Sequence, residues 1–168
     1  SVALVHDIMA GPLPSEYAAC DILYADPPWQ TGLAEFDYRA GVAEGRTYRA
    51  FVVAIRRIVE ASRMPVVLLA GAQTQLHLPV ARQAFDLSHN GRRSTALVFG
   101  TELNISSPGT DVDLLRFLAG RYQRVGDFLC GYGRTGRVFL EAGKSFTLSD
   151  YNPQCIGYIA ANAAKWVT

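Results

Sequence analysis

The sequence predicts an α/β fold in which a mostly parallel central sheet is flanked by helices. Two observations lead to this prediction. Short apolar runs alternate with stretches of helical periodicity, and the runs are almost continuously apolar, as in parallel strands buried on both faces. A chain of 168 residues, 49% hydrophobic and 18% charged, has the size and composition of a compact domain. We therefore expect a single domain over residues 1–168.

Six segments have the Val, Leu, Ile and Phe content of buried strands. They are Val2–His6, Asp21–Ala25, Val66–Ala70, Thr95–Gly100, Val125–Leu129 and Phe146–Ser149. The dipeptide Asn90–Gly91 is typical of a tight hairpin turn. It predicts an antiparallel strand pair that closes one edge of the sheet.

Three segments are predicted to be helices. Apolar residues recur at helical spacing in Tyr48–Ser62 and in Asp111–Tyr122, and Pro153–Trp166 begins with a proline, which the first helical turn accepts. The segment Gln30–Arg46 differs, because it holds three glycines and little periodicity. It is predicted to be a long mobile loop that would act as a lid.

Charge and cysteine content argue against several classes of protein. The formal net charge of +1 does not by itself indicate a polyanionic partner, and the arginine bias over lysine is equally typical of a GC-rich genome. Three cysteines without C-x-x-C spacing argue against a disulfide framework and a zinc site. His6, His77 and His89 are far apart in the sequence and are interpreted as ordinary surface or core residues. No metal site is expected.

Neither a membrane span nor a signal peptide is expected. No apolar run approaches the ~20 residues of a span, and the start of the chain lacks the basic and then apolar pattern of a signal peptide. The cysteine usage suits a reducing compartment. We expect a cytoplasmic protein.

The most distinctive motif is Asp26-Pro27-Pro28-Trp29, which follows a predicted strand. Proline cannot donate to a sheet ladder, so the strand must end at Asp26. In open α/β sheets ligands bind beyond the carboxyl ends of the strands. There the Asp26 carboxylate and the Pro27 carbonyl can each accept a hydrogen bond from an NH2 group, and Trp29 can stack on a base, which contributes ~1–3 kcal/mol. The motif indicates a site for a planar amine, with an ordinary turn as the alternative.

The second motif joins a strand to a helix through a glycine-rich turn. Gly131, Gly133 and Gly136 have G-x-G-x-x-G spacing. Such a turn lets the backbone approach a nucleotide-like ligand at a helix N-terminus. The next predicted strand is followed by Asp150, and an acidic residue at that place can bind ribose hydroxyls. On spacing alone, NAD binding is a competing interpretation.

Together these motifs resemble those of S-adenosylmethionine-dependent amino-group methyltransferases that act on adenine N6 or cytosine N4. Asp26–Trp29 resembles their catalytic motif, and the turn from Cys130 to Gly136 resembles their cofactor loop. The catalytic motif precedes the cofactor loop, which is similar to the circularly permuted order of β-class and MT-A70-like enzymes. The resemblance covers nearly the whole chain and implies a Rossmann-like methyltransferase fold. The loop departs from the family pattern at Tyr132 and Arg134, where small residues are usual.

The resemblance also implies roles for individual residues. The catalytic residues would be Asp26, Pro27, Pro28 and Trp29. S-adenosyl-L-methionine would be bound by Asp7, Asp127, Cys130, Gly131, Tyr132, Gly133, Thr135, Asp150 and Asn152. Contacts to nucleic acid are expected from Arg39, Arg46, Tyr48, Arg49, Arg92 and Arg93.

The expected reaction is methylation of adenine N6 in DNA, as in a restriction–modification or phage system. No segment is long enough for a separate target-recognition domain, so a homodimer or a partner subunit would compensate. RNA adenine N6 and DNA cytosine N4 are alternative substrates. A non-catalytic protein of this fold that binds nucleic acid or a partner is the alternative from another functional class.

Overall fold

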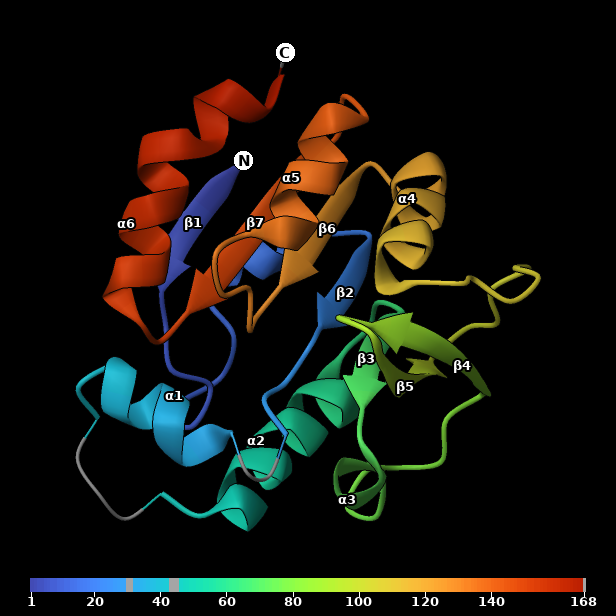
Figure 1. Cartoon of the computed structure of the whole chain (residues 1–168), viewed down its shortest axis with the longest axis horizontal. Helices are drawn as coiled ribbons and strands as arrows, with labels where there is room; N and C mark the ends of the chain where they lie inside the picture. Colours follow the sequence, from blue (N-terminus) through green and yellow to red (C-terminus); the bar gives the residue numbers. More distant parts are fainter. Residues whose placement is uncertain (30–31, 43–45, 168) are drawn as a thin grey trace.

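The computed structural model describes residues 1–29, 32–42 and 46–167. In this part of the chain a seven-stranded sheet carries helices on both faces (Figure 1). The strands are β1 Val2–Val5, β2 Ile22–Ala25, β3 Val66–Ala70, β4 Gln83–His89, β5 Arg92–Phe99, β6 Arg124–Asp127 and β7 Ser145–Asp150. The α-helices are α1 Leu33–Arg39, α2 Tyr48–Ala61, α3 Ala72–Gln75, α4 Asp111–Arg121, α5 Arg134–Glu141 and α6 Pro153–Asn162, and two 3₁₀ helices are η1 Ser15–Ala19 and η2 Ala163–Val167.

The strand order across the sheet is β1-β7-β6-β2-β3-β5-β4. Strand β2 pairs in parallel with β6 on one side and with β3 on the other. The chain leaves β2 toward β3 and leaves β6 toward β7, in opposite directions along the sheet. Ligands bind outside the carboxyl ends of strands at such a switch point. The topology therefore predicts a ligand site at the carboxyl ends of β2 and β6.

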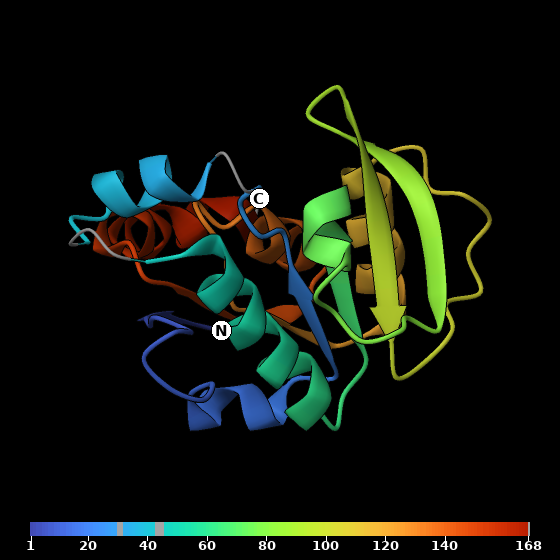
Figure 2. The ribbon, with the colours of Figure 1, turned by 90° about the horizontal axis from the view of Figure 1, so that it is seen from below.

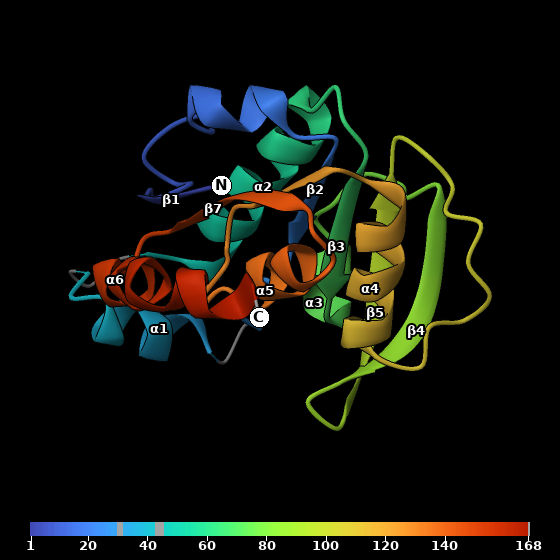
Figure 3. The ribbon, with the colours of Figure 1, turned by 90° about the horizontal axis from the view of Figure 1, so that it is seen from above.

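Two hydrophobic cores lie on the two faces of the sheet. In β2, Ile22 and Tyr24 pack in the core that α4, α5 and α6 cover, whereas Leu23 and Ala25 pack in the core that η1 and α2 cover. Successive side chains of a strand point to opposite faces, which explains why all four are buried. Figures 2 and 3 show the two helical layers from opposite sides.

The predicted fold class is confirmed, and all six predicted strands are present within a few residues of their expected ends. The hairpin is also confirmed, because β4 and β5 pair antiparallel across Asn90 and Gly91. Both turn residues have positive φ, 49° and 74°, as a type I′ turn requires. Strand β4 was not predicted as a separate element, since its outward-facing residues interrupt the apolar pattern.

The prediction of one long loop over Gln30–Arg46 is wrong for Leu33–Arg39, which forms α1. This helix has seven residues, and of its side chains those of Leu33 and Asp37 are buried. So few buried positions produce no visible periodicity in the sequence. Residues 30–31 and 43–45 lie outside the described part, and the mobility of the segment stays a prediction.

Helices in the described ranges are too short or too polar to cross a lipid bilayer.

Candidate active site

A cleft of about 790 Å³ lies at the switch point of the sheet. Its lining comes from the carboxyl ends of β2, β6 and β7, from the turn after β6 and from the tip of the β4–β5 hairpin. Both sequence motifs therefore meet in one cleft, because parallel neighbours end on the same edge of a sheet.

All four residues from Asp26 to Trp29 line this cleft. Strand β2 ends at Ala25, immediately before the motif, as the two prolines require. The Trp29 carbonyl accepts a hydrogen bond from the Gly32 amide at 2.7 Å. The guanidinium of Arg92, from β5, lies 5.8 Å from the centre of the Trp29 ring, within cation–π range.

The glycine-rich turn has a distinct reason for each of its three glycines. Gly133, the N-cap residue before α5, has φ of 84°, and a Cβ there would lie 2.8 Å from the Trp166 ring. At Gly131, with φ of 49°, a Cβ would meet no atom within 4 Å, so its backbone is open to the cleft. At Gly136 a Cβ would lie 2.6 Å from Leu148 of β7. Gly133 thus permits the tight turn, Gly131 leaves room for a close ligand, and Gly136 lets α5 pack against β7.

Two carboxyl groups lie at the floor of the cleft. Asp150 ends β7, and its two carboxylate oxygens accept hydrogen bonds from the backbone amides of Gly131 and Asn152, each at 2.9 Å. Asp127 ends β6, and its carboxylate accepts from the Leu129 amide at 3.1 Å. Burial raises the pKa of both carboxyl groups, that of Asp127 to about 7. The cleft therefore holds an acidic group whose charge changes near neutral pH.

Cys130 and Cys155 line the cleft as free, buried thiols. Burial raises the pKa of the Cys130 thiol far above its ordinary value and that of Cys155 to about 11. Both are neutral at physiological pH, so neither is a thiolate nucleophile.

At the rim, Tyr132 and Tyr158 contact each other edge to face with ring centres 5.3 Å apart.

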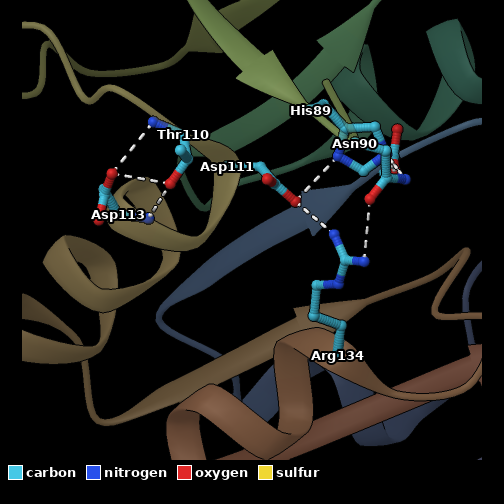
Figure 4. A network of polar contacts seen from close by, with 7 residues as sticks. His89, Asn90, Thr110, Asp111, Asp113 and Arg134 are labelled. Carbon is cyan, nitrogen blue, oxygen red and sulfur yellow. Dashed lines mark hydrogen bonds and ion pairs between the residues drawn. The ribbon is translucent and has the colours of Figure 1, made fainter. Parts of the chain in front are cut away.

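His89 connects the first motif to the rest of the cleft, which corrects its interpretation as an ordinary histidine. Its Nε2 lies 3.0 Å from Asp26 Oδ2, and its Nδ1 lies 2.9 Å from Asp111 Oδ2. Arg134 donates to the same Asp111 oxygen at 2.7 Å and to Asn90 Oδ1 at 3.2 Å. Figure 4 shows His89, Asp111 and Arg134 converging from β4, α4 and α5.

Local structure at the start of α4 explains why Asp111 stands beside His89. Thr110 and Asp113 form a capping box, in which each side chain accepts a hydrogen bond from the other residue's backbone amide. The Ser88 amide donates to the Gly109 carbonyl at 3.0 Å, which joins the end of β4 to this helix start. A helix N-terminus also stabilises a carboxylate such as Asp111.

The predicted cofactor residues divide into two groups. Asp127, Asp150, Asn152 and the four turn residues Cys130, Gly131, Tyr132 and Gly133 all line the cleft, as does Thr135. Asp7 lies outside this lining and accepts two hydrogen bonds from Arg46, at 3.0 and 3.2 Å.

The structure places one of the predicted nucleic-acid residues, Arg92, in the cleft lining. Arg46 is engaged by Asp7 and lies 3.6 Å from Asp37, and Arg39 and Arg93 pair with Glu35 and Asp86 at exposed positions. The Tyr48 hydroxyl is hydrogen-bonded to Thr74, and Arg49 is exposed on α2.

Among the described residues, no group of three or more His, Cys, Asp or Glu side chains is arranged to hold a metal ion.

The mostly parallel sheet, with helices on both faces and a cleft at its switch point, is a Rossmann-like α/β fold. TTHA0409 of Thermus thermophilus, assigned as a DNA modification methylase, matches with a TM-score of 0.61 and 13% identity over 98% of this chain and 95% of that chain. The same protein complexed with S-adenosyl-L-methionine matches at 0.61 with 12% identity, over 98% and 93% of the two chains. M1.HpyAVI matches with a TM-score of 0.56 and 12% identity over 85% and 86%. At these identities the likeness shows the fold.

No protein-family model matches the chain, and no curated protein matches it.

Proposed function

We propose that this chain is an S-adenosylmethionine-dependent methyltransferase that methylates the N6 amino group of adenine in DNA. The observation that carries the proposal is that Asp26–Trp29 and the Gly131–Gly133 turn line one cleft at the ends of the adjacent strands β2 and β6. The fold that the chain shares with TTHA0409, a protein solved with S-adenosyl-L-methionine, supports the same cofactor here.

The chemistry of the cleft fits this cofactor. S-adenosylmethionine carries a positively charged sulfonium and an ammonium group. Burial disfavours the ionised forms of Asp127 and Asp150, and a bound cation would stabilise these carboxylates. The Asp150 carboxylate, fixed by two backbone amides, can accept hydrogen bonds from ribose hydroxyls. Gly131 leaves its backbone open to a close ligand. When bound, the cofactor supplies an electrophilic methyl group.

Asp26–Trp29 would bind and orient the accepting amine. The Asp26 carboxylate and the Pro27 carbonyl accept hydrogen bonds from the NH2 group, which turns the nitrogen lone pair toward the methyl carbon. Trp29 stacks on the base. Alignment of this kind contributes ~7–11 kcal/mol to a bimolecular step. A base in a duplex must first be flipped out, at a cost of roughly a few kcal/mol.

Incubation with methyl-labelled cofactor and separate samples of DNA and RNA, followed by nucleoside mass spectrometry, tests the proposal. We expect N6-methyladenine in DNA, and its loss in Asp26→Ala. Glu60→Ala, which removes an exposed carboxylate on α2, is the matched control. If Asp26→Ala forms as much product as the wild type, the proposed role of Asp26 is refuted. If the product is N4-methylcytosine, or appears in RNA alone, adenine N6 in DNA is refuted as the substrate.

Absence of any product from an intact, folded chain, together with no cofactor binding by calorimetry, would replace the enzyme with the non-catalytic alternative. We also propose that a second copy or a partner subunit extends the surface that recognises the target. Light scattering with and without a DNA duplex would measure the molar mass of the chain in solution and so its oligomeric state.

A further inference from the structure

The Asp26 carboxylate is held from one side. Its Oδ2 contacts His89 Nε2 at 3.0 Å, and the Asp26 side chain keeps 31% of its surface exposed. In the described part of the chain no hydrogen bond or ion pair reaches Oδ1 of Asp26. An amine can therefore bind Asp26 through Oδ1 while His89 stays on Oδ2.

His89 is itself fixed by its surroundings. The hairpin turn at Asn90–Gly91 brings the end of β4 over the cleft, and the buried Asp111 accepts a hydrogen bond from Nδ1 of the imidazole. A histidine oriented through one nitrogen by a carboxylate presents the other nitrogen in a defined position.

The charges of the cluster balance when His89 is protonated. Asp26 and Asp111 are then matched by His89 and by Arg134, which donates to Asp111. The hydrogen bond to Asp26, opposed by burial and reinforced by Asp111, raises the pKa of His89 above its ordinary value.

Two further titratable groups, Tyr24 and Asp127, lie close to the Asp26 carboxylate. Burial keeps Tyr24 neutral by raising its pKa, and burial also raises the pKa of Asp127 to about 7. The negative charge of Asp26 adds to both shifts. Asp127 is therefore a neighbouring group with a pKa of about 7, and the variant Asp127→Asn separates its effect from that of His89.

The contacts of Nε2 also support the neutral ring. The Asn90 side-chain nitrogen lies 2.9 Å from His89 Nε2, and its amide orientation is set by Arg134, which donates to the Asn90 oxygen. Two donors cannot share a hydrogen bond, so the contact with Asn90 forms when Nε2 is unprotonated, whereas the contact with Asp26 forms when Nε2 is protonated. Nε2 thus has an acceptor in Asp26 when it carries a proton and a donor in Asn90 when it does not.

We infer that His89, held by Asp111, is a positioning residue for Asp26 and the destination of the proton that the amine loses; this inference rests on the proposed function. The amine nitrogen bonds to the methyl carbon as the C–S bond breaks, and the electron pair of that bond stays on sulfur. The methylated nitrogen, now cationic, gives one proton to the Asp26 carboxylate. Rotation of the carboxyl group brings this proton to Nε2 of neutral His89.

The first experiment needs no turnover. A titration of the histidine ring nitrogens by ¹⁵N NMR, with the His89 signal assigned through His89→Gln, should give His89 a pKa above the ordinary value of about 6.5. Both Asp26→Asn and Asp111→Asn should lower it, since each removes a negative charge. An ordinary pKa in the wild type, unchanged by either variant, would overturn the inference whether or not the chain is an enzyme.

The second experiment is the pH dependence of kcat on the DNA substrate. The wild-type rate should rise with pH through the pKa of His89, because the neutral ring accepts the proton. In His89→Gln, which keeps a donor near the Nε2 position, kcat should fall by at least about tenfold with KM within about twofold, and the rise should disappear. Asp111→Asn should move the rise to lower pH. His77→Gln, at an exposed site outside the cleft, is the control.

The outcomes separate the two proposals. An active wild type whose kcat and pH profile are unchanged in His89→Gln would overturn the inference and leave the proposed function standing. An inactive wild type would overturn the proposed function, and the NMR titration would still decide on the Asp26–His89–Asp111 coupling.

Discussion

Arg134 donates a hydrogen bond to Asp111 at 2.7 Å, and this contact joins the helix after the glycine turn to the helix that supports His89. Arg134, which stands where the resembled family has a small residue, thus supplies a positive charge beside the buried Asp111. The departure at position 134 is thus explained by a contact within the chain.

Replacement of Arg134 by Gln should raise the pKa of His89 further. Removing the cation leaves Asp111 more negative toward the imidazole, which favours the protonated ring. The pH at which kcat reaches half its maximum should therefore move upward. Arg56→Gln, which breaks an exposed ion pair on α2, should leave this pH unchanged. A downward movement in Arg134→Gln would contradict the arrangement.

Alanine substitutions in the glycine turn should separate folding from cofactor binding. Gly133→Ala combines a positive φ with a Cβ 2.8 Å from Trp166, and we expect a loss of ~2–4 kcal/mol of unfolding free energy. A Cβ at Gly131 would meet no atom within 4 Å, so Gly131→Ala should lower the unfolding free energy by only ~1–2 kcal/mol. The same variant should weaken cofactor binding at least about tenfold. Urea unfolding and calorimetry would measure the two effects.

Gly157→Ala is the control for this pair, since Gly157 lies inside α6 with open space around it. A stabilisation of ~0.5–1 kcal/mol is expected there. Equal cofactor affinity in Gly131→Ala and wild type would show that the turn does not approach the ligand.

Cofactor affinity should depend on pH through Asp127. Burial raises the pKa of this carboxyl group to about 7, so it is mostly protonated at pH 6 and mostly ionised at pH 8. Because the ionised form attracts a cationic cofactor, the affinity should increase as pH rises through 7, by at most about tenfold per pH unit. Calorimetry across this range would show it, and Asp127→Asn should flatten it, whereas Asp86→Asn should not.

Stability of the ligand-free chain should have the opposite dependence. The pKa of Asp127 is higher in the folded chain than in the unfolded one, so the folded chain binds more protons between about pH 4 and pH 7. The contribution of Asp127 to the unfolding free energy should fall as pH rises through this window. Above pH 7, Asp127→Asn should be more stable than the wild type in urea unfolding.

Arg46 should act mainly on stability. It donates to both carboxylate oxygens of Asp7, lies near the buried Asp37 and stacks over the Tyr151 ring at 5.0 Å. Arg46→Gln leaves these acids without their cation and should lower the unfolding free energy by ~2–3 kcal/mol. Arg49→Gln, on the exposed face of α2, should have little effect. A change in the salt dependence of DNA binding, with no change in stability, would instead support the predicted nucleic-acid contact.

Local signals were sufficient for most of the fold and for the centre of the cleft. The apolar run before Asp26 and the glycines after Asp127 each mark a strand end, and parallel strands bring such ends to one edge. The Asn90–Gly91 dipeptide likewise predicts its hairpin from turn geometry alone.

The role of His89 could not be read in this way. Its contact with Asp26 depends on the path of a hairpin whose first strand has no clear apolar pattern, and its contact with Asp111 depends on where α4 begins. The pairing of Arg46 with Asp7 also joins residues from distant parts of the chain. An arginine inside a predicted loop gives no sequence signal of an ion pair, and the sequence therefore predicts a nucleic-acid contact for Arg46 instead.

The position of Arg92 over Trp29 has a consequence for the choice of base. The Arg92 guanidinium lies over one side of the Trp29 ring, 5.8 Å from its centre, so a base that stacks on that side must exchange one favourable partner for another. Only the difference between the two contributes to binding. If Trp29 stacks on the accepting base as proposed, a purine, with its two fused rings, should compensate for the displaced cation better than a single pyrimidine ring, and we expect the site to prefer the larger base.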